Sequence, residues 1–423
     1  MRFFRIVLVF LLIGFIQKSE AQQSSSGFLD GLLRSHTDWF QPVLANPAAF
    51  EVQILYTRID RDEKNRPTFT TFSWRENPAR YFYPASTIKF PMILLALEKI
   101  NRLRIPGLTR ETPMFHESSW KGQPSVSEDS TSANGWPSVA HYSRKILLVS
   151  DNAAFNRLYD FVGPTEANRL LTSKGYRTRM RHRLSGSFTP AENRKTNAVV
   201  FKRGDSIIYR QPMLTTDSLP GGPPVLRGKG HFAGGKLVRK PMNFAGKNVM
   251  TLRDGHNMIR AVVFPESMPA AKRFQLTEDD RRFLLQYMSQ YPRESPYPAY
   301  YRDSTLTDNW VKYFLPQKAD STGSIRIFNK VGLAYGYVSD HSYFVDFSRN
   351  IEFLLSAVIL TNRDGIFNDN QYEYDEIAFP FMQNLGRLIH EYEIRRPRKH
   401  VPDLTQFRMI YDRPDTAPDP SRF

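Results

Sequence analysis

The sequence predicts an α+β fold, with an antiparallel sheet built from N-terminal and C-terminal strands, flanked by helices, beside a mostly helical lobe. Strand-like stretches gather towards the two ends of the chain, whereas the middle has mainly the apolar spacing of helices. Strands from both ends can share one sheet, and a cleft between sheet and lobe is then the natural place for a site.

The first 21 residues predict a secretory signal peptide rather than part of the fold. Met1–Arg5 is basic, Ile6–Ile16 is apolar, and Gln17–Ala21 turns polar and ends in Ser-Glu-Ala. This order is typical of a signal, and the apolar run is too short to span a bilayer comfortably. We therefore expect cleavage after Ala21 and a periplasmic or secreted protein without a stable membrane anchor. An uncleaved N-terminal anchor is the alternative.

The N-terminal part of the mature chain predicts a helix, a hairpin and a second helix. Apolar spacing indicates a helix over Phe28–Phe40. Two strand-like stretches, Phe50–Asp60 and Phe69–Trp74, flank a charged turn and predict an antiparallel hairpin. Pro84–Leu103 is the most apolar helix, and the Ser-, Pro- and Gly-rich stretch Leu108–Ser138 predicts a loop.

The rest of the chain completes one domain over residues 28–392. In chain order we expect helices at Ser138–Val149, Ala153–Val162 and Thr165–Ser173, strands at Val199–Tyr209 and Lys236–Phe244, helices at Leu252–Val263 and Glu278–Tyr291, strands at Ser324–Leu333, Tyr337–Phe347 and Ile351–Thr361, and a helix at Tyr374–Tyr392. The basic and Pro/Asp-rich end predicts a peripheral C-terminal tail over 393–423.

Composition excludes several kinds of site. The chain has no cysteine, so disulfides, thiol catalysis and thiolate metal sites are absent. Its nine histidines show no metal-binding spacing, and we expect neither a metal nor a cofactor; His182 and His341 are interpreted as structural. The net charge of +16 fits a solvated basic surface or attraction to an anionic envelope polymer, and no motif for nucleic acid accompanies it. We expect a monomer.

A candidate nucleophile opens the apolar helix. In Ser86-Thr87-Ile88-Lys89 the first and last residues share a helical face, so the Lys89 amine can reach the Ser86 hydroxyl. A lysine kept partly neutral can remove the serine proton, and the helix start offers an N–H to an oxyanion. An N-cap serine with a surface lysine is the alternative. A second copy of the pattern, Ser118–Lys121, falls in the predicted loop and is interpreted as coincidence.

Two further short motifs follow in the sequence. Ser150-Asp151-Asn152 separates two predicted helices, where helix capping is the simple explanation. In the catalytic interpretation Ser150 relays a proton to a leaving nitrogen and Asn152 hydrogen-bonds a substrate amide. Lys330-Val331-Gly332 lies late in a predicted strand, where an exposed lysine and a bulge glycine are the alternative. In the catalytic interpretation Lys330 supplies positive charge, and Gly332 lets the backbone approach the substrate.

Together these motifs resemble the class A β-lactamases and penicillin-binding proteins, whose set is Ser-x-x-Lys, Ser-Asp-Asn and Lys-Thr-Gly. The resemblance extends to Tyr142–Phe161, Lys330–Phe347 and Val358–Asn362, and covers most of Phe28–Tyr392. It implies a β-lactamase-like fold in which Ser86 and Leu333 offer their backbone N–H groups to the oxyanion. The site residues that it implies are Ser86, Lys89 and Ser150 for catalysis and Asn152, Lys330, Gly332 and Leu333 for substrate binding.

The sequence departs from this group at three places. Val331 stands where the group has a threonine whose hydroxyl helps hold the β-lactam carboxylate. The group also carries a Glu and, four residues later, an Asn that position the deacylating water. Here Glu192 and Asn197 are five apart; Glu192 is the candidate, and an exposed loop glutamate is the alternative. Finally, residues 200–248 are an insertion that either reshapes the cleft or decorates the surface.

The leading hypothesis is an exported serine hydrolase that opens a β-lactam amide through a Ser86 acyl-enzyme. The first alternative is a peptidase of the same superfamily acting on D-Ala-D-Ala ends of peptidoglycan peptides, or an esterase. The second is a non-catalytic sensor that binds penicillin or peptidoglycan.

Overall fold

A computed structural model of the chain describes residues 26–120, 123–315 and 323–412. The expected signal peptide lies outside these residues. Within them, no helix is long and apolar enough to cross a membrane.

A five-stranded antiparallel sheet forms the centre of the molecule, in the order β10-β11-β12-β1-β2. As expected, the strands come from the two ends of the chain, since Gln53 pairs with Val358 at the junction of β1 and β12. Their β-branched and aromatic residues suit a pleated surface that is covered on both faces. The bounds are β1 Gln53–Arg61, β2 Pro67–Trp74, β10 Ile325–Ala334, β11 Tyr337–Asp346 and β12 Ile351–Leu360.

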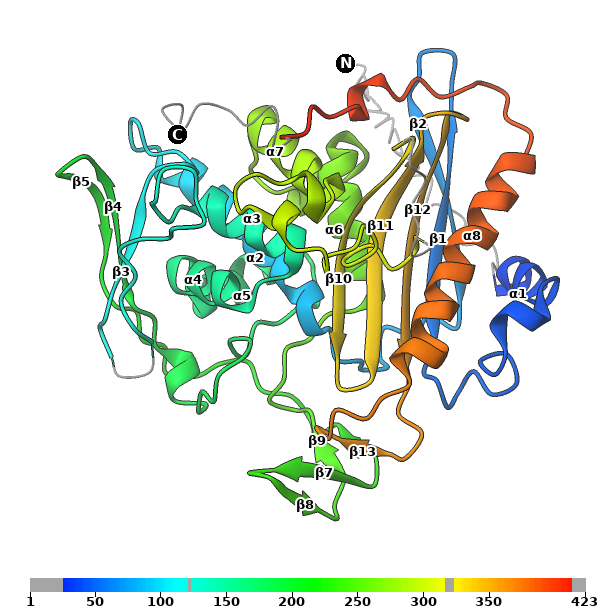
Figure 1. Ribbon diagram of the computed structural model, residues 1–423, viewed down its shortest axis with the longest axis horizontal. Coiled ribbons are helices and arrows are strands. Elements are labelled where there is room, and N and C mark those ends of the chain that lie inside the picture. The colour runs from blue at the N-terminus through cyan, green and yellow to red at the C-terminus, as the bar shows by residue number, and fades with distance from the viewer. Residues whose placement is uncertain (1–25, 121–122, 316–322, 413–423) are drawn as a thin grey trace, which may run out of the picture.

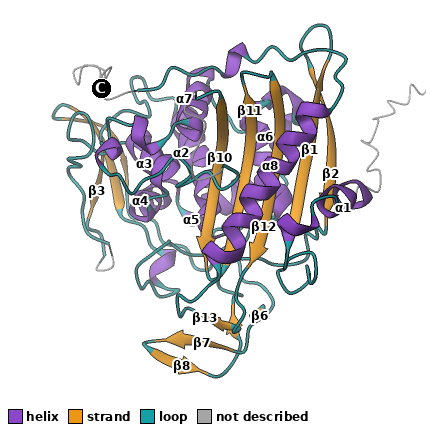
Figure 2. Ribbon diagram, turned by 45° about the vertical axis from the view of Figure 1, so that its right-hand side comes forward, coloured by secondary structure: helices purple, strands orange, loops and turns teal. Residues whose placement is uncertain are grey.

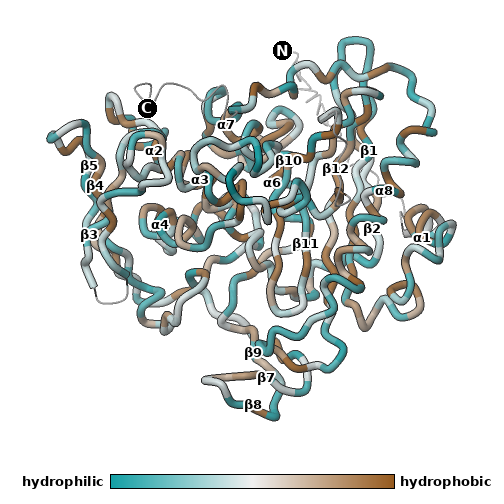
Figure 3. The backbone as a smooth tube through the Cα atoms, viewed as in Figure 1, coloured by the Kyte–Doolittle hydropathy of each residue, from teal (hydrophilic) through white to brown (hydrophobic). Residues whose placement is uncertain are grey.

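Helices cover both faces of this sheet. Figure 2 shows α8 (Phe379–Arg395) crossing one face, with α1 (Ser26–Arg34) beside it and α6 (Leu252–Val263) behind the strands. Each face has its own apolar core: Phe353 and Leu385 pack on the α8 side, and Leu354 packs on the side of α6. In Figure 3 the hydrophilic stretches include the tip of the β1–β2 hairpin.

The helical lobe lies beside β10, one of the two edge strands of the sheet (Figure 1). The sequence predictions of its helices are confirmed within a few residues. Their bounds are α2 Lys89–Leu103, α3 Val139–Val149, α4 Asn152–Val162, α5 Pro164–Ser173 and α7 Glu278–Ser289.

The lobe also carries a small sheet that the sequence did not predict correctly. The single strand expected at Val199–Tyr209 is a hairpin of β4 (Ala198–Arg203) and β5 (Ser206–Gln211), because Gly204 adopts a positive φ and reverses the chain. The expected loop 108–138 contains β3 (Met114–Glu117), which pairs with β4.

The remainder of the predicted insertion forms a small projection below the main body (Figure 1). The strand expected at Lys236–Phe244 is divided between two short strands. The projection contains β6 Leu226–Arg227, β7 Gly230–Ala233, β8 Lys236–Val238, β9 Met242–Asn243 and, from the C-terminal third, β13 Ile366–Phe367.

The C-terminal segment is not a free tail in its described part. The helix predicted from Tyr374 begins with a π turn and continues as α8 to Arg395. Beyond it, Leu404 and Phe407 are buried in the main core, and the Phe407 ring contacts the ring of Tyr343. Residues up to 412 therefore contribute to the domain.

Candidate active site

Ser86 lies in a short 3₁₀ turn, Ala85–Ile88, that leads directly into α2. The Thr87 N–H and hydroxyl both donate to the Pro84 carbonyl, which tightens the turn. Ala85 has a φ of +46°, a conformation that costs energy for a residue with a Cβ. The Ser86 side chain caps no helix and has no hydrogen-bond partner among the described residues, so its hydroxyl is available to a substrate.

Two lysines meet at Ser150. The Lys89 ammonium donates to the Ser150 carbonyl oxygen and lies 3.3 Å from its hydroxyl oxygen. The Lys330 ammonium lies 2.8 Å from the same hydroxyl oxygen and 2.9 Å from the Val331 carbonyl oxygen. One residue from each of three motifs that are far apart in the sequence thus lies at this point, and the Lys89 ammonium contacts Ser150 rather than the Ser86 hydroxyl.

The local sequence explains how Ser150 reaches the lysines. Ser150 ends α3 in the left-handed conformation with a φ of +62°, and Asp151 caps α4 by accepting from the Ala154 N–H at 2.7 Å. Since Asp151 takes the capping role, the side chains on either side of it are left for other contacts. Asn152, the first residue of α4, is exposed in the cleft.

Burial lowers the pKa of both lysines. It lowers the pKa of Lys89 to about 7, against an opposing effect of Asp151. Burial, together with the neighbouring Lys89 ammonium, places the pKa of Lys330 well below its ordinary value. A buried cation is costly, so near neutral pH a substantial fraction of Lys89 is an uncharged amine that can accept a proton.

Gly332 lies where β10 packs against the turn that carries Ser86. A Cβ at this position would lie 2.5 Å from the Pro84 carbonyl oxygen and 3.1 Å from the Thr87 Cγ2 atom. The glycine therefore permits β10 to pack against the turn that carries Ser86, and this contact sets the distance between the Lys330 strand and the nucleophile.

Ser86 lies where two cavities meet. The larger, of about 620 Å³, is bounded by Ser150, Val331 and a wall made of residues 307–313 and the start of α8. The smaller, of about 400 Å³, is bounded by Leu184, Ser185 and several tyrosines. Both share Ser86, Asn152 and Leu333.

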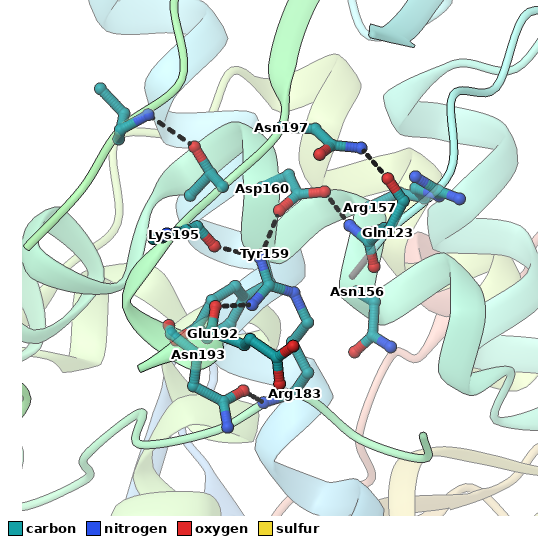
Figure 4. A network of polar contacts seen from close by, with 12 residues as sticks. Gln123, Asn156, Arg157, Tyr159, Asp160, Arg183, Glu192, Asn193, Lys195 and Asn197 are labelled. Atoms are coloured by element: carbon teal, nitrogen blue, oxygen red, sulfur yellow. Dashed lines mark hydrogen bonds and ion pairs between the residues drawn. The ribbon is translucent and has the colours of Figure 1, made fainter. Parts of the chain in front are cut away.

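The segment after α5, which was expected to supply a deacylating carboxylate, is held in place by a buried ion pair between Arg183 and Asp160. Figure 4 shows Arg183 reaching the Asp160 carboxylate at 2.6 Å and the backbone carbonyls of Glu192 and Lys195. Both side chains of the pair are fully buried. Asn197 is also buried and donates to the Gln123 carbonyl oxygen at 3.0 Å.

The structure does not bring Glu192 to Ser86. Its carboxylate accepts from the Thr189 N–H at 2.7 Å and from the Thr189 hydroxyl at 2.9 Å, which closes a local turn. It lines neither of the two cavities, where the same segment presents Leu184 and Ser185 instead. Sequence reasoning missed these two residues, because their position depends on the burial of Arg183 in the assembled lobe.

Residues 41–391 match the family model Beta-lactamase2, the beta-lactamase enzyme family. The chain belongs to this family. No curated protein matches. Among the solved structures, it is similar to a beta-lactamase from Xanthomonas campestris, with 16% sequence identity and a TM-score of 0.46 over 85% of this chain and 98% of that chain. It is also similar to a beta-lactamase from Sphaerobacter thermophilus, with 14% identity and a TM-score of 0.44 over 84% of this chain and 96% of that chain. A third similar structure is PBP-A, with 13% identity and a TM-score of 0.45 over 86% of this chain and 96% of that chain.

This member of the beta-lactamase family has a further buried lysine, Lys312, behind the site. Lys312 donates to the Asn329 side-chain oxygen at 2.8 Å, and the Asn329 amide donates to Asp340 at 2.8 Å. Asp340 also accepts from the Tyr313 N–H at 3.1 Å. This chain of contacts attaches the wall at 307–313 to the sheet. Burial raises the pKa of Asp340 to about 7 and lowers that of Lys312 to about 7.

The histidines take no part in this beta-lactamase-family site. His182 lies against the Arg183 carbonyl and His341 beneath Gly255, and burial lowers their pKa values to about 4 and about 3. Among residues 26–120, 123–315 and 323–412, no group of three His or carboxylate side chains is arranged to hold a metal ion.

Proposed function

We propose that this protein is an exported class A β-lactamase-like serine hydrolase that opens a β-lactam amide through a Ser86 acyl-enzyme. The observation that carries the proposal is the convergence of Lys89 and Lys330 on Ser150, beside the cavity that contains Ser86. Export to the periplasm or beyond rests on the N-terminal sequence alone.

In the proposed reaction, uncharged Lys89 accepts the Ser86 proton, directly or through a water molecule, as the oxygen attacks the carbonyl carbon. The backbone N–H groups of Ser86 and Leu333 stabilise the oxyanion. Ser150 passes a proton to the leaving nitrogen, and water then hydrolyses the ester. No cofactor takes part.

The test is the intact mass of the purified protein after exposure to benzylpenicillin. We expect one adduct with the mass of the intact drug, located on Ser86, and none on the Ser86→Ala protein. The matched control is Ser118→Ala, since Ser118 begins the second copy of the Ser-x-x-Lys pattern and lies in a loop. An adduct that persists on Ser86→Ala contradicts the proposed nucleophile.

A second candidate, a peptidase acting on peptidoglycan peptides, is favoured by the position of Glu192. Of the described residues that line the two cavities, Asp375 is the sole carboxylate, and it lies on the larger one. Without a carboxylate beside the ester, deacylation is slow. We propose to compare turnover of a chromogenic cephalosporin with that of a D-alanyl-D-alanine peptide. Rapid cephalosporin turnover supports the β-lactamase, and a persistent adduct with peptide turnover supports the peptidase.

A further inference from the structure

The two cavities correspond to the two sides of the bond that is broken. Ser150 lines the larger cavity and not the smaller one. Under the proposed mechanism Ser150 protonates the leaving nitrogen, so the larger cavity receives the leaving amine. The smaller cavity, with Leu184 and Ser185, then receives the acyl group that stays on Ser86.

The leaving-group cavity is large and is lined in part by aromatic side chains. Trp310, Tyr313 and Phe379 at the start of α8 line it, and the Tyr313 and Phe379 rings pack together with centroids 5.1 Å apart. Its volume of about 620 Å³ falls within the range of pockets that enclose drug-sized ligands. A single alanine therefore fills only a small part of it.

The same cavity has no cationic side chain that could bind a carboxylate among the described residues that line it. Among the described residues that line it there is no lysine, arginine or histidine, and Asp375 is the one charged side chain. Val331 provides no hydroxyl group. Lys330 lies beneath the surface, only 2% exposed, and donates to the Ser150 hydroxyl and the Val331 carbonyl. A leaving group with a carboxylate next to its nitrogen thus meets no exposed cation on these walls, and it meets the repulsion of Asp375.

We infer that, among compounds that acylate Ser86, the site prefers those whose leaving amine is large, partly apolar and without a carboxylate beside the nitrogen, as at an internal peptide amide, and that the carboxylate of a β-lactam slows acylation without preventing it. This inference rests on the proposed acylation of Ser86. In the reaction the carbonyl carbon–nitrogen bond breaks as the Ser86 oxygen–carbon bond forms, and the serine proton ends on the leaving amine. Water then releases the acyl group as a carboxylic acid.

Benzylpenicillin and its methyl ester test this selectivity, because they share one acyl group and differ only in the carboxylate beside the leaving nitrogen. The rate constant for Ser86 acylation is measured for each by intact mass and divided by the rate of hydroxide hydrolysis of the same compound. We expect the normalised rate of the ester to exceed that of the acid by at least fivefold. Equal rates, or a faster acid, overturn the inference and leave the acylation of Ser86 intact.

Asp375→Asn tests the charge of the cavity directly. We expect the variant to raise the rate of the acid several-fold relative to that of the ester. Glu376→Gln is the matched control, since Glu376 is the exposed neighbour in the same turn and does not line the cavity. An unchanged ratio in Asp375→Asn contradicts the role of Asp375. If neither compound acylates Ser86, the proposed function fails and the inference fails with it.

Discussion

The Lys330 ammonium nitrogen lies 2.8 Å from the Ser150 hydroxyl oxygen. Lys89 lies 3.3 Å from the same oxygen. A hydroxyl has two acceptor sites and a single proton, so two lysines that donate to Ser150 leave its own proton free to be donated elsewhere. Under the proposed mechanism the acceptor is the leaving nitrogen of a substrate at Ser86, and this arrangement suits Ser150 to the role of proton donor.

The first prediction concerns pH. With its pKa lowered to about 7, Lys89 loses its proton between pH 6 and pH 8. If the uncharged amine is the base, the rate of Ser86 acylation rises about tenfold over this interval. Lys89→Arg, whose side chain stays charged, should lower the rate by about 10²-fold or more. Intact-mass time courses measure both, and a rate that is independent of pH in this interval excludes Lys89 as the base.

The second prediction concerns the contact between β10 and the Ser86 turn. Gly332→Ala places a methyl group against the Pro84 carbonyl, and overpacking of this kind costs about 1–3 kcal/mol. We expect a lower free energy of unfolding and slower acylation of Ser86. Gly246→Ala is the control, because its added Cβ meets no atom within 4 Å and should change neither quantity. Denaturant unfolding and acylation kinetics measure the two quantities. If Gly332→Ala and Gly246→Ala have the same free energy of unfolding and the same acylation rate, the packing role is refuted.

The third prediction concerns deacylation. Ser185 lines the acyl-side cavity with Ser86, whereas Glu192 does not. We expect Ser185→Glu to shorten the lifetime of the penicillin adduct, because a carboxylate there can position water. We expect Glu192→Gln to leave the lifetime unchanged. The decay of the adduct mass over time gives the lifetime for each variant. A longer lifetime in Glu192→Gln would support the hypothesis that Glu192 positions the deacylating water.

The fourth prediction concerns the anchor of residues 183–197. Asp160→Ala leaves Arg183 buried without its partner, and breaking such a pair costs about 3–5 kcal/mol. Glu117→Ala removes a surface pair with Arg210, whose side chains are 44% and 53% exposed, and should have little effect. Denaturant midpoints test the difference, and equal midpoints for the two variants argue against an anchoring role.

Much of the fold could be predicted from local signals. The α3 and α4 helices are marked by apolar spacing and by Asp151 as a cap, and the terminal strands by β-branched and aromatic residues. The strand β3 could not be predicted, because four residues in a polar stretch gain their structure from pairing with distant β4. The hairpin at Gly204 did carry a turn signal that the sequence prediction overlooked.

The site could be predicted only where its residues belong to motifs. Lys89, Ser150 and Lys330 meet, and Ser86 lines the same cavity as Ser150, whereas the loop after α5 follows a path set by the buried Arg183. Burial of this kind depends on the assembled lobe, so spacing alone pointed to Glu192. The wall at Trp310 has no sequence signature either, because it is a loop held by buried Lys312.

The pairing of β1 with β12 also constrains when activity can arise. The strand carrying Gln53 is synthesised early, and its partner Val358 about 300 residues later. Contacts so distant in sequence close slowly. A ribosome-bound or truncated chain that ends before β12 holds Ser86 and Lys330 without the sheet that positions them. Acylation of Ser86 should therefore report completed folding, and tagged penicillin should distinguish finished molecules from fragments.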